Sequence, residues 1–249
     1  PPEVMNQPVR LNPLKGTRNN FALARDNRTR FFCILAISWF WLYGSCFLTQ
    51  VPNYTVTVLN GHPRLISILL AAFIVGVASG SLLCHRLSRG VVEPGIVPIG
   101  ALGLSLFAFD LSFTSLSFQQ MHGALVSITP SQFLDLSGGL HILADLTLIG
   151  LFGGLFIVPL NSMLQQRTAS GKRARVLSVN AIMNAAFMVG GSLLGIVFLS
   201  LLQWSIVEFF IAVASLNILV VGIIFLLVPE FTTQFIVWIK NRLKSPSTL

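Results

Sequence analysis

Six long apolar stretches, separated by short polar segments, run through the sequence. Each stretch has about 20 residues or more, which is enough for a helix to cross a hydrocarbon core of roughly 30 Å. A helix also satisfies its own backbone hydrogen bonds, as the hydrocarbon interior requires. We therefore predict an all-α membrane protein with six transmembrane helices. The predicted spans are residues 31–51, 65–84, 95–114, 141–164, 176–202 and 205–228.

The basic residues fall on alternate connections between these stretches. Of the 16 Lys and Arg residues, Arg64 alone lies on one side; the others lie in the N-terminal segment, in the loops after the second and fourth stretches, and in the tail. Basic segments resist translocation, so the side that carries them is predicted to face the cytoplasm, with both ends of the chain. Topology and anionic lipid headgroups also account for the net charge of +8, so membrane lipids rather than nucleic acid are the expected partner.

Polar segments flank the predicted bundle, which occupies residues 31–228. Residues 1–30 are expected to form a cytoplasmic linker with a short interfacial helix around residues 21–25. Residues 229–249 alternate apolar and basic side chains. This pattern is typical of an amphipathic helix in the cytoplasmic headgroup region. A frayed continuation of the last span is an equally good interpretation of this tail.

Prolines mark two further places in the chain. Pro52 is a turn signal in the external connection predicted at residues 51–64. Pro159, inside the fourth span, should kink the helix and free a carbonyl group, with Asn161 nearby. The longest external connection is predicted at residues 115–140, where a short surface helix has no clear position.

Small or polar residues recur at four-residue spacing within several spans. In lipid, small pairs let helix backbones approach closely, and we interpret them as packing contacts. These pairs are Gly76 and Gly80, Gly150 and Gly154, and Gly191 and Gly195. Asn180 and Asn184 have the same spacing near the cytoplasmic end of the fifth span. They can line a cavity or hydrogen-bond between helices, and we prefer the second interpretation.

Three acidic residues, Asp110, Asp145 and Glu208, lie inside the predicted spans. A charge in the bilayer costs about 2.5–3.5 kcal/mol on insertion scales, so each acid needs a reason. All three are predicted near the external ends of their helices, where solvation at the interface is one explanation for Asp110 and Glu208. His141 lies four residues before Asp145, on the same helical face. This pair can carry a proton, bind a cationic headgroup or latch an external gate, and we prefer the gate or headgroup role to a structural one.

The predicted midplane of the bilayer is apolar, with Trp39, Trp41, Phe152, Phe187 and Met188 at that depth. A carrier for sugars or amino acids needs polar groups there to replace the hydration of its substrate. A substrate with a hydrocarbon tail and a polar head suits this chain better. The candidate substrate or gating residues are therefore His141, Asp145, Asn180, Asn184, Asp110 and Trp39.

Enzymatic chemistry finds no support in the sequence. The nearest approach to the His-x4-Asp acyltransferase signature is His141 and Asp145, which have three intervening residues and lie within a span. No Gly-rich phosphate loop follows a strand. Cys33, Cys46 and Cys84 lack metal-ligand spacing, so structural roles are expected. We predict a protein that is not an enzyme and has no cofactor and no bound metal.

The segment after the second span carries a recognisable motif. Ser81-Leu-Leu-Cys-His85-Arg86-Leu-Ser88-Arg89 resembles the Gly-x-Leu-x-Asp-Arg-x-Gly-Arg motif of the major facilitator superfamily. Both arginines match, whereas serines replace the two glycines and His85 replaces the acid. The resemblance implies that the six spans are half of a twelve-helix bundle whose two halves are related repeats.

Longer stretches resemble one family within that superfamily. Residues 47–54, 80–84, 143–154 and 228–231 are similar to the C-terminal half of bacterial lysophospholipid transporters, in the form fused to a glycerophospholipid acyltransferase and an acyl-carrier-protein synthetase. The resemblance implies a carrier that moves a lysophosphatidylethanolamine-like lipid across the bacterial inner membrane by alternating access. It also implies two partners, a missing N-terminal six-helix half and a fused or associated acyltransferase.

Two other functions stay open at this point. The first is a membrane module that anchors or feeds a lipid acyltransferase without transporting anything itself. The second is a facilitator for apolar drugs, which the same apolar midplane also favours.

Overall fold

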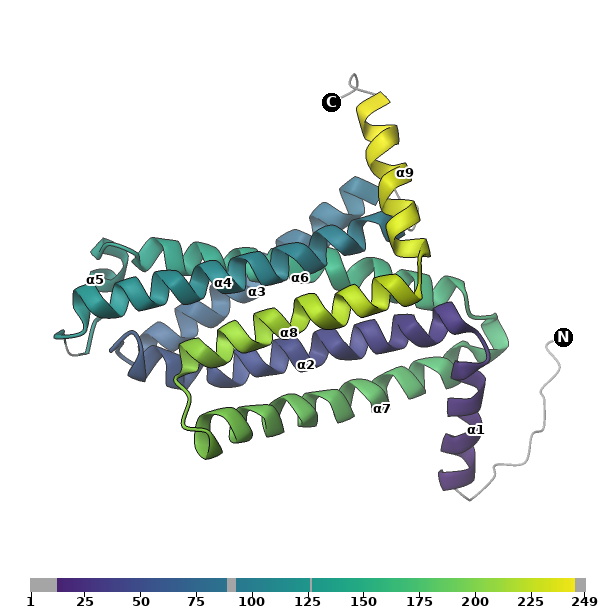
Figure 1. The fold of residues 1–249 in the computed structure, drawn as a ribbon, viewed down its shortest axis with the longest axis horizontal. Helices are drawn as coiled ribbons and strands as arrows, with labels where there is room; N and C mark the ends of the chain where they lie inside the picture. Colours follow the sequence, from purple (N-terminus) through teal and green to yellow (C-terminus); the bar gives the residue numbers. More distant parts are fainter. Residues whose placement is uncertain (1–12, 89–92, 126, 245–249) are drawn as a thin grey trace, which may run out of the picture.

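Six long helices lie side by side in alternating directions in the computed structural model, which describes residues 13–88, 93–125 and 127–244 (Figure 1). All six are long and apolar enough to cross a membrane, so the prediction of an all-α, multi-pass membrane protein is confirmed. A 3₁₀ turn, η1 (Pro94–Ile96), precedes the third of them, and a π-helical segment, η2 (Ile196–Leu201), follows the fifth. The six are α2 (Arg28–Thr57), α3 (Arg64–Ser88), α4 (Val97–His122), α6 (Gly139–Gln166), α7 (Ser170–Gly195) and α8 (Ile206–Leu227).

Helix α2 corrects the predicted boundary of the first connection. It continues through Pro52 to Thr57, where a turn was expected from residue 51. A proline inside a helix removes one backbone hydrogen bond, which packing beyond it can offset. Here the next turn places Tyr54 in the core, with its hydroxyl 2.6 Å from the Ser115 hydroxyl.

The predicted connection at residues 115–140 is also shorter than expected. Helix α4 runs on to His122, because Ser115 and Phe118 continue its buried face. The rest of the segment contains the short surface helix α5 (Pro130–Asp135). A capping box between Thr129 and Gln132 starts α5 by satisfying two backbone N–H groups.

Helix α6 likewise continues past its proline. Pro159 is buried within the helix and does not end it. The Asn161 amide donates to the Ile157 carbonyl at 3.0 Å, so this side chain bonds to its own helix beside the proline.

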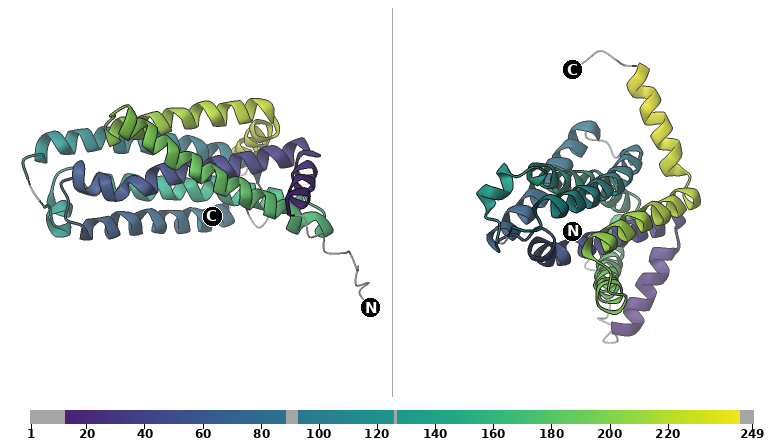
Figure 2. Two further views of the ribbon diagram at one scale, coloured as in Figure 1. Left: turned by 90° about the horizontal axis from the view of Figure 1, so that it is seen from below. Right: turned by 60° about the vertical axis from the view of Figure 1, so that its left-hand side comes forward.

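Two shorter helices leave the bundle at the same end and on different sides (Figures 1 and 2). Helix α1 (Pro13–Arg25) precedes α2 and is longer than the interfacial helix predicted at residues 21–25. Helix α9 (Glu230–Lys244) follows α8 after a break at Val228, whose φ of −127° and ψ of 81° lie outside the helical region. The proline at position 229 disfavours a helical conformation at Val228. The tail is therefore a separate helix and not a continuation of the last span.

Specific contacts fix α1 and α9 to the bundle. Arg30 is buried and donates from Nη2 to the Leu23 carbonyl at 2.5 Å, which ties the end of α1 to the start of α2. Arg167, at the end of α6, forms an ion pair with Glu230 in the first turn of α9. Helix α9 also lies against η1, where a Cβ on Gly95 would be 2.8 Å from the Gln234 carbonyl oxygen.

Glycines bring α3 and α6 into backbone contact, as their spacing predicted. A Cβ on Gly76 or Gly80 would collide with the carbonyl oxygens of Thr147 and Leu151 of α6. From the other side, a Cβ on Gly154 would lie 2.7 Å from the Ser81 nitrogen. Close backbone approach of this kind drives helix association in lipid, where apolar burial alone gives little preference.

The third predicted glycine pair behaves differently at its two positions. A Cβ on Gly191 would lie 2.8 Å from the Leu42 carbonyl oxygen, so this glycine allows α7 to approach α2. A Cβ on Gly195 would make only an ordinary contact, 3.4 Å from the Gln50 side chain. The packing prediction is therefore confirmed for Gly191 and is wrong for Gly195.

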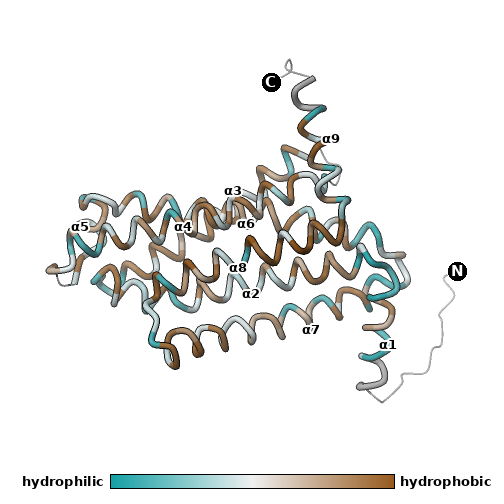
Figure 3. Tube along the Cα trace, in the orientation of Figure 1, coloured by the Kyte–Doolittle hydropathy of each residue, from teal (hydrophilic) through white to brown (hydrophobic). Residues whose placement is uncertain are grey.

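Hydropathy follows the arrangement of the helices (Figure 3). The most apolar residues lie along the spans, and hydrophilic residues gather where α1 meets the bundle. Basic side chains such as those of Arg18, Arg86, Lys172 and Lys240 come from elements at that end, whereas Arg64 opens α3 at the other. The uneven charge seen in the sequence is thus an uneven charge in space.

Candidate acidic cluster near one end of the bundle

Three ionisable side chains meet towards the end of the bundle that is opposite to α1 and α9. We call them the acidic cluster: Asp110 from α4, and His141 and Asp145 from the first two turns of α6. His141 Nε2 lies 3.1 Å from Asp110 Oδ2 and 3.7 Å from Asp145 Oδ1. The spacing of four residues puts His141 and Asp145 on one face of α6, and α4 packs along this helix, so that Asp110 completes the group.

The turn before α6 determines where the helix begins and therefore where His141 lies. Gly138 has a φ of 91°, a left-handed conformation that glycine adopts without strain. A Cβ on the next residue, Gly139, would collide with the Phe133 carbonyl oxygen of α5. The chain can therefore pass close to α5 and enter α6 with His141 in the first turn.

Burial divides the cluster into an open mouth and a closed base. The side chains of His141 and Asp110 are 53% and 44% exposed, whereas that of Asp145 is 1% exposed. Asp145 Oδ2 is buried and has no hydrogen-bond partner in the described part of the chain. A buried carboxylate oxygen without a partner costs free energy, because nothing replaces its hydration.

The charges of the cluster do not balance. Two carboxylates face one imidazole, and within the described residues His141 is the only side chain that forms an ion pair with either acid. The cluster is therefore suited to receive a cation from the aqueous side: a proton, an ammonium group or a metal ion.

The sequence anticipated part of this cluster. The structure confirms the pairing of His141 with Asp145, which follows from their spacing. It also brings in Asp110, which the sequence gave no reason to join to them, since 31 residues separate Asp110 from His141. Only the packing of α4 against α6 supplies that contact.

Glu208 has a local structural role and lies outside the cluster. It is the third helical residue of α8 and forms a capping box with Ser205, whose backbone N–H donates to Glu208 Oε2 at 2.7 Å. The side chain is exposed. Capping of the helix at an exposed position is therefore the local reason for this acid.

Asn184 connects two helices, as the preferred interpretation of this asparagine pair predicted. Its amide nitrogen donates to the Ser38 hydroxyl at 2.9 Å, and its oxygen accepts from the Trp41 indole at 3.1 Å, so that α7 is bonded to α2. Asn180 is buried, and its side-chain oxygen has no partner among the described residues, so no bond between helices is shown for it.

A polar network that was not expected from the sequence lies in the middle of the bundle. Asn217 of α8 is 1% exposed. It accepts a hydrogen bond from the Trp39 indole at 2.8 Å and donates to the Ala101 carbonyl and the Ser105 hydroxyl at 3.1 and 2.9 Å. The expectation of an apolar midplane is therefore wrong at this point. Trp39, a predicted substrate contact, is buried and bonded within the protein, and a lone asparagine in the apolar run of α8 was the only signal.

The predicted motif loop is helical over the part that the structure describes. Ser81 and Ser88 both lie in α3, with the Ser81 hydroxyl bonded to the Val77 carbonyl of the same helix at 2.8 Å. His85 and Arg86 are exposed in the last two turns of α3. Arg89 lies outside the described residues.

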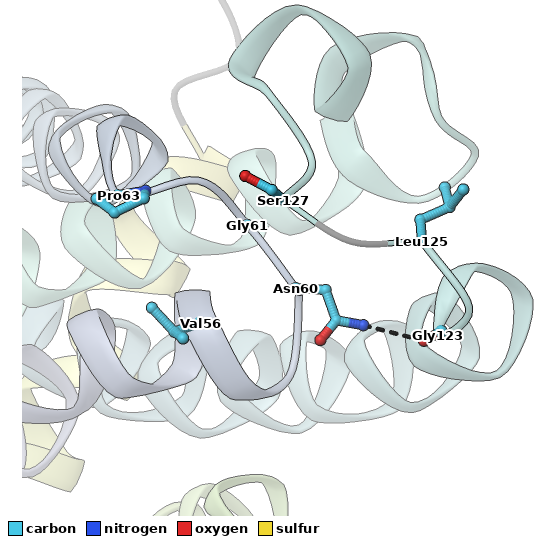
Figure 4. Close-up of a pocket in the computed structure, with 7 residues that line it drawn as sticks. All are labelled: Val56, Asn60, Gly61, Pro63, Gly123, Leu125 and Ser127. Carbon is cyan, nitrogen blue, oxygen red and sulfur yellow. Dashed lines mark hydrogen bonds between the residues drawn. The ribbon is translucent and has the colours of Figure 1, made fainter.

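A shallow cavity of about 350 Å³ lies between two loops at the same end as the acidic cluster (Figure 4). The loops are joined by paired backbone hydrogen bonds between residues 60–62 and Ile128, and the Asn60 amide donates to the Gly123 carbonyl at 3.2 Å. None of the described residues that line the cavity is ionisable. It offers only neutral groups from these residues, so the acidic cluster is the better candidate for a binding site.

Fold and cluster together define a polytopic helical membrane protein with an anionic site near one end. Comparison with protein-family models, with curated proteins and with solved structures finds no match to this chain. What the protein does must therefore be argued from the cluster and the bundle themselves.

Proposed function

We propose that this chain is one six-helix half of a membrane carrier for an amphiphilic lipid, namely a lysophospholipid with an ammonium in its headgroup. The observation that carries the proposal is Asp145, a buried carboxylate with an unpartnered oxygen beneath the half-exposed Asp110 and His141. An ammonium group offers three N–H donors and a positive charge, which suit two carboxylates. Lysophosphatidylethanolamine has such a headgroup, and the resemblance of residues 47–54 and 143–154 to lysophospholipid transporters favours the same lipid.

The flanks of the bundle support a carrier that handles a hydrocarbon chain. In their most apolar windows, α3 and α7 are only 22% and 11% buried within the chain, against 61% for α2 and α4. Exposed apolar side chains such as Ile74 and Val189 therefore face lipid, an acyl chain or another helical half. In carriers built from repeats the substrate site lies between two halves, so the partner is a second six-helix unit and transport requires both.

Binding of lysolipids to the purified chain in nanodiscs tests this proposal. Fluorescent lysophosphatidylethanolamine should bind at least 10-fold more tightly than lysophosphatidylglycerol, whose headgroup lacks the ammonium. Asp110→Asn should remove most of this preference, because it halves the negative charge of the acidic cluster. The buffer contains a chelator, so that no metal ion competes.

Asp135→Asn is the matched control, since Asp135 is an exposed acid of α5 outside the cluster. It should leave the headgroup preference unchanged. Equal binding of the two lysolipids to the wild-type chain would rule out headgroup recognition by the cluster.

A second candidate function is a membrane anchor for a lipid-modifying enzyme. It is favoured by α1 and α9, which extend from the same end of the bundle on different sides. The lysolipid assay separates the two functions, because an anchor needs no dependence on Asp110. A drug facilitator predicts instead that an apolar drug displaces the lysolipid whatever its headgroup.

A further inference from the structure

The acidic cluster has the donor set of a metal site, although no bound metal was predicted from the sequence. One imidazole nitrogen and two carboxylate oxygens, from His141, Asp110 and Asp145, all lie within 4.8 Å of one another. Imidazole combined with carboxylate is a common ligand set for zinc and for other divalent ions of the first transition series. Magnesium and calcium prefer oxygen ligands alone.

The two distances from His141 to the carboxylates already match those around a bound ion, and the two carboxylate oxygens lie within 4.8 Å of each other. In a tetrahedral site with metal–ligand distances of about 2.0–2.2 Å, the ligand atoms lie roughly 3.2–3.6 Å apart. His141 Nε2 is already 3.1 Å from Asp110 Oδ2 and 3.7 Å from Asp145 Oδ1. The two half-exposed side chains can adjust around the fixed, buried Asp145.

An independent observation points to a ligand at this place. Asp145 is 99% buried, its Oδ1 faces His141, and its Oδ2 has no partner among the described residues. Such a carboxylate is stabilised most directly by a cation that all three side chains share. The exposed mouth supplies a route for the ion and leaves room for water as a fourth ligand.

We propose that Asp110, His141 and Asp145 form a binding site for one divalent transition-metal ion of the zinc class. The ion is held at the aqueous end of the bundle, with Asp145 as the buried ligand and water completing the coordination. It competes with a headgroup ammonium for the same carboxylates, so that zinc would inhibit lysolipid binding. The metal site does not depend on the proposed carrier function, because the ligands are complete within this chain.

Metal binding to the purified full chain, in detergent and without a polyhistidine tag, tests the proposal. Equilibrium dialysis with Zn²⁺ should find one ion per chain, and Co²⁺ should give the visible absorption bands of a tetrahedral site. His141→Gln and Asp145→Asn should each weaken Zn²⁺ binding at least 10-fold, and Asp135→Asn should not change it. Lipid is absent, so the result is independent of headgroup recognition.

Melting temperature supplies a second readout that separates binding from folding. Zn²⁺ should raise the melting temperature of the wild-type chain and not that of Asp145→Asn. Without metal, Asp145→Asn should melt at the same temperature or higher, because it replaces a buried charge by a neutral amide. If Asp145→Asn does not fold, His141→Gln still tests the site at a half-exposed position. The proposal is overturned if the folded wild-type chain binds no stoichiometric Zn²⁺, or if His141→Gln binds it as tightly as the wild type.

Discussion

Asn217 joins three helices through one amide group. It bonds to Trp39 of α2 and to Ala101 and Ser105 of α4. Asn217→Leu leaves the Trp39 N–H and the Ser105 hydroxyl with fewer partners in the core, so we expect a loss of about 1–3 kcal/mol in the free energy of unfolding. Denaturant titration of the detergent-solubilised chain, followed by circular dichroism, measures this change.

Ser215→Ala on the same helix is the control for Asn217→Leu. Ser215 is exposed and, among the described residues, its hydroxyl bonds only to the Ile211 carbonyl of its own helix, at 2.8 Å. We expect a change within about 0.5 kcal/mol for this variant. If Asn217→Leu unfolds at the same denaturant concentration as Ser215→Ala, the network does not stabilise the bundle.

Contacts within one helix could be predicted from the sequence, whereas the partners in contacts between helices could not. The pair of His141 and Asp145 was predictable, because helical geometry places residues four apart on one face. The sequence indicated that Asp110 is a costly charge within a span. It could not indicate that His141 is its partner, since this contact depends on how α4 and α6 pack. Asn217 was overlooked because a polar residue in an apolar run gives no sign of whether its bonds lie within the protein.

At the scale of elements, the interface between α3 and α6 depends on the absence of side chains. Gly80→Ala places a methyl group against the Leu151 carbonyl and should force the two helices apart. We expect a loss of about 2 kcal/mol or more, in the range of overpacked sites. The midpoint of thermal unfolding in detergent measures the effect.

Gly222→Ala provides the opposite expectation for the same chemical change. Nothing lies within 4 Å of a Cβ at Gly222 of α8. Alanine favours the helix over glycine by about 0.5–1 kcal/mol, so this variant should be as stable as the wild type or more stable. A comparable loss in both variants would mean that glycine itself, and not the contact with α6, matters at position 80.

The sequence predicted the number and type of the long helices better than it predicted where they begin and end. Apolar runs long enough to cross a bilayer predicted all six spans, because a helix satisfies its own backbone hydrogen bonds in lipid. The proline at position 52 misled the prediction, since packing of Tyr54 continues α2 beyond it. The tail could not be resolved from composition alone, and the break at Val228 decides in favour of a separate helix.

At the scale of the whole molecule, the uneven charge predicts the orientation in the membrane. Ser131→Cys in α5 and Thr232→Cys in α9 place single thiols at exposed positions towards opposite ends of the bundle. A membrane-impermeant maleimide should label Ser131→Cys in intact cells and Thr232→Cys only after permeabilisation. The native thiols are buried, so the wild-type chain should give little background. The reverse labelling pattern would contradict the predicted topology.

Helices α1 and α9 have a mechanical consequence for the bundle. Both leave it at the same end and extend in different directions. Helix α1 is fixed to the bundle by Arg30, and α9 is fixed to it by the ion pair of Arg167 with Glu230. The sequence predicts that both helices lie in the headgroup layer, which amphipathic helices resist leaving, so we expect them together to hold this end of the bundle level. Tilting of the bundle as a whole would lift one of them into water or press it into hydrocarbon. We therefore expect movement of the bundle at the far end, where Asp110 and His141 are half-exposed.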